Sequence, residues 1–98
     1  MSKEEILSQL QTNGAGKKFN KEIEALVLIG QGEWDRAHNI VQDIQTQNAA
    51  WIHGLLHWEE GDLWNADYWY RKAGETRPLD SNIDQEWERI AKTIMQKQ

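Results

Sequence analysis

The sequence predicts a single small all-α domain of about five helices. Apolar residues recur at helical spacings of three and four along most of the chain, and Gly or Asn residues separate these stretches. Six Trp, two Tyr and one Phe supply the large side chains that a 98-residue chain needs to bury enough surface. We therefore expect one hydrophobic core and one domain covering residues 1–98.

The chain is expected to begin with a short helix followed by a linker. Ser2 and Glu5 have the spacing of a capping box, which favours a helix over residues 2–11. Residues 12–19 contain two Gly and two Lys and are predicted to form the linker. Asn20 is then placed to cap the next helix.

A first helical hairpin is expected after this linker. Its first helix runs from Asn20 to about Gln31 and is apolar around most of its circumference, which indicates a central position. Gly32 breaks the chain, and apolar residues then recur at helical spacing from Trp34 to about Gln47. These two stretches are predicted to pack against each other.

A second hairpin and a last helix complete the prediction. An apolar helix ends at Gly61, and its partner ends at Gly74, where Gly suits the residue after a helix. After Pro78, Ser81 is placed to cap a C-terminal helix. This last helix has one amphipathic stripe, formed by Ile83, Trp87, Ile90 and Ile94.

The chain repeats itself at an interval of 29 residues. Residues 32–37 superimpose on residues 61–66, and both segments begin with Gly and end with Ala. The second copy resembles the tetratricopeptide and Sel1-like repeats. Their signature is matched in order and spacing by Gly54, Gly61, Ala66, Tyr70, Ala73 and Pro78. The string formed by residues 34–42 and 51–74 is also similar to a group of small uncharacterised helical proteins.

The resemblance implies a domain organisation and a class of function. It implies two tetratricopeptide-like helical hairpins over residues 20–78, flanked by an N-terminal helix and linker, 1–19, and a C-terminal capping helix, 79–98. Such repeats generally act as protein-binding scaffolds, so we expect a binding module for a protein partner or for a second copy of the chain. The resemblance is nearly silent on activity, because one fold hosts many functions.

Composition and charge exclude several other classes of function. The net charge is -5 and the eleven Lys and Arg residues are scattered, which argues against nucleic acid as a partner. No stretch has the ~20 apolar residues of a membrane span, and the N-terminal segment lacks a signal-peptide pattern. The chain has no Cys, which fits a reducing compartment, so we expect a cytoplasmic protein with no membrane partner.

Four polar residues are candidates for one ligand-binding pocket. His53 and His57 stand one helical turn apart, and Glu24 occupies the position equivalent to His53 in the first repeat. His38 lies one turn after Trp34 on the next helix. The site is therefore predicted to comprise these four polar residues and a wall of Trp34, Trp58 and Tyr70.

Four interpretations of this pocket stay open. Both imidazoles on the second hairpin can be hydrogen-bonded inside a helix contact, which is a purely structural role. They can also bind a small molecule, hold a metal ion together with Glu60, or exchange protons in acid–base catalysis. The chain has no complete zinc-protease, triad or phosphate-loop motif. No catalytic residue, metal ligand or cofactor is therefore assigned, and an enzyme is the less favoured class.

Trp64 and Tyr68 are candidates for an interface. They stand one turn apart on the side of their helix opposite Ala66 and Tyr70. The simpler interpretation is that the C-terminal helix covers them with its apolar stripe. The alternative is a contact with a protein partner or a homodimer contact, because contiguous exposed aromatic surface is common at interfaces.

Overall fold

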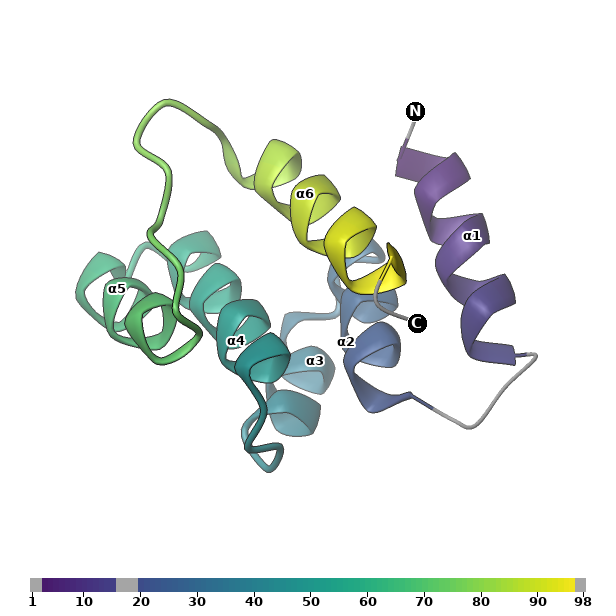
Figure 1. The fold of residues 1–98 in the computed structure, drawn as a ribbon, viewed down its shortest axis with the longest axis horizontal. Helices are drawn as coiled ribbons and strands as arrows, with labels where there is room; N and C mark the ends of the chain where they lie inside the picture. Colours follow the sequence, from purple (N-terminus) through teal and green to yellow (C-terminus); the bar gives the residue numbers. More distant parts are fainter. Residues whose placement is uncertain (1–2, 16–19, 97–98) are drawn as a thin grey trace.

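The computed structural model describes residues 3–15 and 20–96, and all regular structure in these ranges is helical (Figure 1). The helices are α1 Lys3–Ala15, α2 Lys21–Gly30, α3 Trp34–Val41, α4 Gln47–Glu59, α5 Leu63–Lys72 and α6 Ile83–Gln96. The prediction of an all-α chain is confirmed, whereas the predicted count of about five helices is one too low. The N-terminal helix, the four hairpin helices and the C-terminal helix each form as separate elements.

The first helix is longer than predicted. Helix α1 continues to Ala15, so the first four residues of the predicted linker are helical. Thr12 Oγ1 donates a hydrogen bond to the Ser8 carbonyl oxygen at 2.9 Å, which holds this side chain against the preceding turn of the helix. The predicted cap at Ser2 and the rest of the linker, 16–19, lie outside the described residues.

Two other helix ends also differ from the prediction, because a side-chain cap lies elsewhere. Helix α3 ends at Val41 rather than near Gln47, since Thr46 caps α4 by accepting a 3.0 Å hydrogen bond from the backbone N–H of Ala49. Helix α6 is capped by Asn82 rather than Ser81. Asn82 Oδ1 accepts from Gln85 N at 2.8 Å, and Gln85 Oε1 accepts from Asn82 N at 3.2 Å.

The two hairpins share the same turn. Gly32 and Gly61 have φ angles of 80° and 85°, a left-handed conformation that favours Gly after a helix. In each turn the residue after the Gly donates its backbone N–H to the carbonyl oxygen of the residue five positions earlier. The two N···O distances are 2.8 Å, from Glu33 to Leu28, and 2.9 Å, from Asp62 to His57. Identical turns 29 residues apart give the sequence repeat a structural counterpart.

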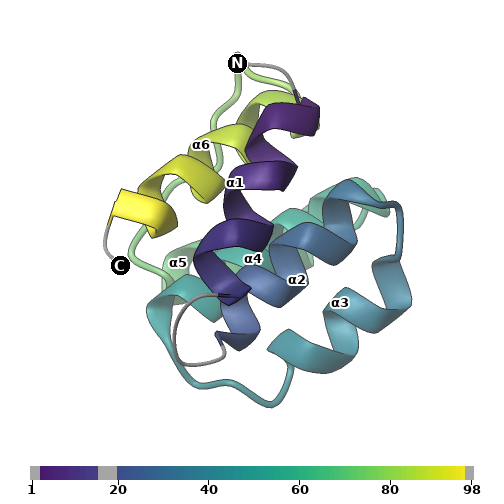
Figure 2. The ribbon, with the colours of Figure 1, turned by 90° about the vertical axis from the view of Figure 1, so that its right-hand side faces the viewer.

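Helix α4 lies at the centre of the packing. It contacts α2, α3, α5 and α6, and every residue from Trp51 to Leu56 is buried. Helix α6 crosses the hairpins on one side and also packs against α1 and α2, as the two views show (Figures 1 and 2). None of the helices in the described ranges is long and apolar enough to cross a membrane.

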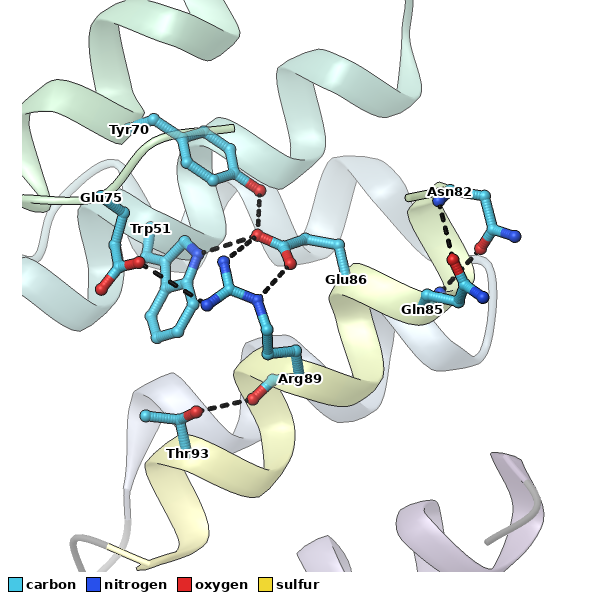
Figure 3. Close-up of polar contacts among 8 residues, drawn as sticks. All are labelled: Trp51, Tyr70, Glu75, Asn82, Gln85, Glu86, Arg89 and Thr93. Atoms are coloured by element: carbon cyan, nitrogen blue, oxygen red, sulfur yellow. Dashed lines mark hydrogen bonds and ion pairs between the residues drawn. The ribbon is translucent and has the colours of Figure 1, made fainter. Parts of the chain in front are cut away.

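A buried carboxylate fixes α6 against α4 and α5 (Figure 3). Glu86 is only 1% exposed, and its Oε2 accepts hydrogen bonds from Tyr70 Oη at 2.7 Å and Trp51 Nε1 at 3.3 Å. Arg89 Nε donates to Glu86 Oε1 at 2.7 Å, which supplies the counter-charge. Burial and the hydrogen bond to Glu86 raise the pKa of the Tyr70 phenol, so it stays protonated as a donor.

Candidate functional site

Three histidines meet where α3 packs against α4. We call His38, His53 and His57 the histidine cluster. Each imidazole offers one ring nitrogen that lies within 4.8 Å of the nitrogens offered by the other two. The ring centroids of His53 and His57, one turn apart on α4, are 4.9 Å apart and nearly parallel. The His38 ring comes from α3 and lies edge-on, 4.8 Å from His53.

Two indole rings form the walls of the cluster. Trp34 stacks on His38 at a centroid distance of 4.9 Å and an interplanar angle of 8°. Trp69 stacks on His53 at 3.9 Å and 10°. The Trp34 Nε1–H also donates to the Leu56 carbonyl oxygen at 2.8 Å, which fixes α3 to α4 beside the cluster. These contacts restrict the rotation of two of the three imidazoles.

The environment keeps the inner imidazoles uncharged. His53 is 5% exposed, and burial lowers its pKa to about 4, with the positive charges of protonated His38 and His57 and of Lys72 acting in the same direction. Burial also lowers the pKa of His38, and the positive charge of protonated His57 lowers it further. At neutral pH these two rings are therefore neutral, and each has one nitrogen with a free lone pair.

The three rings differ in their hydrogen bonds. His57 Nδ1 lies 2.5 Å from Glu60 Oε1, so this ring has a partner. Within the described part of the chain, His38 and His53 have ring contacts but no hydrogen-bond partner for either ring nitrogen. The purely structural interpretation, in which both imidazoles of α4 are hydrogen-bonded, therefore does not hold for His53.

The other predicted pocket residues have different surroundings. Glu24 does not lie within 4.8 Å of all three histidines, and its buried Oε2 has no hydrogen-bond partner among the described residues. Trp58 packs under the guanidinium of Arg77, 5.4 Å from its ring centroid. Tyr70 points to Glu86. The sequence did not single out Trp69 for this pocket, and its indole is the one that stacks on His53.

The predicted interface residues lie on the outer face of α5. Trp64 is 76% exposed and Tyr68 38% exposed, so the simpler interpretation, in which the C-terminal helix covers them, is wrong. Helix α6 instead packs against α1, α2 and α4, because Trp87 is buried and its Nε1–H donates to the Leu26 carbonyl oxygen at 2.9 Å. Leu63, the residue before Trp64, is also exposed, at 45%, and we call the exposed surface formed by Leu63, Trp64 and Tyr68 the aromatic face.

Comparisons of the chain with protein-family models, with curated proteins and with solved structures give no match.

Proposed function

We propose that the chain is a helical binding module and that the histidine cluster is its binding site. The observation that carries this proposal is the buried ring of His53. It faces two other imidazoles and has no hydrogen-bond partner among the described residues. Among the described residues, the one buried polar side-chain atom without a partner is Glu24 Oε2, so the ring nitrogens of His53 are accessible to a bound group at the point where the three imidazoles meet.

The arrangement favours binding over acid–base catalysis. A general base works best when its pKa lies near the operating pH, whereas burial holds the pKa of His53 at about 4. Lone pairs on neutral imidazoles are instead suited to accepting a proton-donating group or to coordinating an ion. The stacked indoles of Trp34 and Trp69 hold the rings in place before a ligand arrives, which reduces the entropic cost of binding.

We also propose that the two hairpins are repeats of the tetratricopeptide or Sel1-like type. The shared turn supports this, as does the close approach of α4 and α5 at Gly54, where the repeat signature has a small residue. In this proposal the first helix of the second repeat carries two of the three histidines. The binding site is then an addition to the repeat scaffold, since these positions would otherwise carry bulky apolar residues.

Native mass spectrometry tests the binding proposal without assuming the ligand. The protein is purified without chelators or added ligand, and its native mass is compared with its denatured mass. We expect an added mass that disappears on denaturation. It should also be absent from a His53→Phe variant, which keeps the ring stack on Trp69 but loses both ring nitrogens. The variant Trp64→Ser, changed on the aromatic face, should keep the added mass. Identical spectra for the wild type and His53→Phe would contradict the proposal.

The aromatic face supports a second candidate function, the binding of a protein partner or a second copy of the chain. Its observation is the exposure of Trp64 beside Leu63 and Tyr68, none of which α6 covers. Large aromatic side chains are enriched at protein interfaces and depleted from free surfaces. This candidate is independent of the histidine cluster, and its test is the association state of variants on this face, described in the Discussion.

A further inference from the structure

We infer that the histidine cluster binds a divalent transition-metal ion of the zinc type, coordinated by one ring nitrogen from each imidazole. This inference rests on the proposed function and names the ligand of the same site. Three observations support it. Three nitrogen donors from α3 and α4 lie close together, the Glu60 carboxylate contacts one of them, His57, and imidazole nitrogen is a donor that such metals prefer.

The spacing of the donors suits one ion. Three nitrogens bound to a tetrahedral zinc at about 2.0–2.1 Å lie roughly 3.4 Å from one another. The three ring nitrogens offered by the cluster already lie within 4.8 Å of one another. His38 and His53 stay stacked on Trp34 and Trp69, and the half-buried ring of His57 is the one that rotates to close the remaining gap.

Glu60 orients one of the donors. Its Oε1 lies 2.5 Å from His57 Nδ1, so a protonated Nδ1 donates to the carboxylate and leaves Nε2 with the free lone pair. Histidines that bind metals usually donate their other ring nitrogen to a carboxylate or carbonyl in this way. Glu60 is therefore a positioning residue, which acts on the ion through His57 and does not touch it.

The donor atoms select the class of metal. Three neutral imidazole nitrogens suit zinc, cobalt, nickel or copper, whereas magnesium and calcium require oxygen donors. Three protein donors leave one position of a tetrahedral ion for water or an exogenous group.

A second group of potential donors shares His57 but is a weaker candidate. His57, Glu60 and Asp62 also place their donor atoms within 4.8 Å of one another, but both carboxylates are on exposed residues. Asp62 is already engaged as the cap of α5, where its oxygens accept from the side chain and backbone N–H of Asn65 at 2.6 and 3.4 Å. The histidine cluster instead offers three imidazole donors, of which His38 and His53 have no hydrogen-bond partner among the described residues.

Isothermal titration of the chelator-treated protein with Zn²⁺ tests the inference, with Mg²⁺ as the control ion. We expect one zinc per chain and no binding of Mg²⁺ under the same conditions. His38→Ala and His57→Ala should each lower the zinc affinity by more than 100-fold. Glu60→Gln should lower it by about 10–100-fold, as is typical for loss of an outer-shell partner. Glu59→Gln, a neighbouring exposed carboxylate, should leave the affinity unchanged.

Two further measurements keep the inference open to refutation if a variant unfolds. Zinc should shift the ring ¹⁵N resonances of all three histidines in the wild-type protein. Asp62→Asn, which keeps an N-cap side chain, should bind zinc as well as the wild type does. Absence of saturable zinc binding would overturn the inference. A zinc affinity that is lost in Asp62→Asn but kept in His38→Ala would also overturn it. Native mass spectrometry can instead give one specific result: an organic adduct that is lost in His53→Phe, in a protein that does not respond to zinc. This result would overturn the inference that the ligand is a metal ion, but it would support the proposed binding site.

Discussion

Replacing Gly54 with Ala tests how closely α4 and α5 pack. A Cβ at Gly54 would lie 2.6 and 2.9 Å from Cδ2 and Cε2 of Tyr70 and 3.1 Å from the Ala66 carbonyl oxygen. Carbon atoms in contact are normally about 3.5–4.0 Å apart, so roughly 1 Å of separation is missing. Neither neighbour can easily give way. The carbonyl belongs to the backbone of α5, and the Tyr70 hydroxyl is held by Glu86 at 2.7 Å.

Two opposing effects set the size of the change. Overpacking in a core costs about 1–3 kcal/mol, whereas Ala in place of a helical Gly gains up to about 1 kcal/mol in helix propensity. Because the Tyr70 ring and the Ala66 carbonyl are both constrained, we expect an overpacking cost in the upper part of the range of about 1–3 kcal/mol. The free energy of unfolding should therefore fall by about 1–2 kcal/mol, which corresponds to a fall in Tm of roughly 5–15 °C for a domain of this size.

Gly30→Ala is the matched control on a different helix contact. Its Cβ would lie 2.7 Å from Leu7 Cδ2 and 3.0 Å from Trp87 Cζ2. The nearer atom is a terminal methyl of a half-buried side chain, which can rotate away. We expect a change of less than about 1 kcal/mol. Both variants are measured by thermal and urea unfolding, followed by circular dichroism. A Gly54→Ala variant no less stable than Gly30→Ala would refute the close contact between α4 and α5.

Three other predictions concern the histidine cluster, Glu86 and the aromatic face. In the metal-free protein, unfolded His53 binds a proton near pH 6.5 and folded His53 near pH 4. Urea melts should therefore show stability falling as the pH drops through this window, by at most about 1.4 kcal/mol per pH unit, and less in His53→Phe. Equal pH profiles of stability for the wild type and His53→Phe would contradict this expectation. Glu86→Leu should cost about 2–4 kcal/mol in thermal melts, because Tyr70 and Trp51 lose a buried acceptor. Glu88→Leu, at a surface pair with Lys92, should leave the melting temperature nearly unchanged, and equal effects of the two substitutions would disprove the role of Glu86. The double variant Trp64→Ser with Tyr68→Lys should keep the wild-type Tm and sediment as a monomer if the aromatic face joins two copies; a variant that unfolds would place the pair in the core.

The sequence predicted helix ends correctly where a single nearby residue determines the end. Asn20 caps α2 as expected, with its Oδ1 accepting from the backbone N–H groups of Glu22 and Ile23. Gly32, Gly61 and Gly74 all take the left-handed conformation that ends a helix. The errors at α3 and α6 arose because several polar residues near each end were able to act as the cap. Which of them does so depends on how the whole helix packs.

The tertiary contacts were predictable only in part. The spacing of His53 and His57 fixes their shared face, and this is why the sequence already pointed to them. The repeat offset placed Glu24 at the position equivalent to His53, but equivalent positions on neighbouring helices do not have to touch. Glu86 was missed altogether, because a Glu beside an apolar stripe has the pattern of a surface residue. Its burial follows from where α6 lies, and the pattern of α6 alone does not specify that.

Among the helices of the described ranges, α5 packs closely against α4 alone, and it meets α6 through the Tyr70–Glu86 hydrogen bond. Elements with few neighbours open more readily than the rest of a fold. The Tyr70–Glu86 hydrogen bond and the ion pair between Arg77 and Asp67, at 2.8 Å, restrain this opening. Because Trp69 belongs to α5, each opening event uncovers the ring of His53. In the proposed metal site, such an opening would remove Trp69 from His53, and we expect the residence time of the bound ion to follow the amide-hydrogen exchange rates of this one helix.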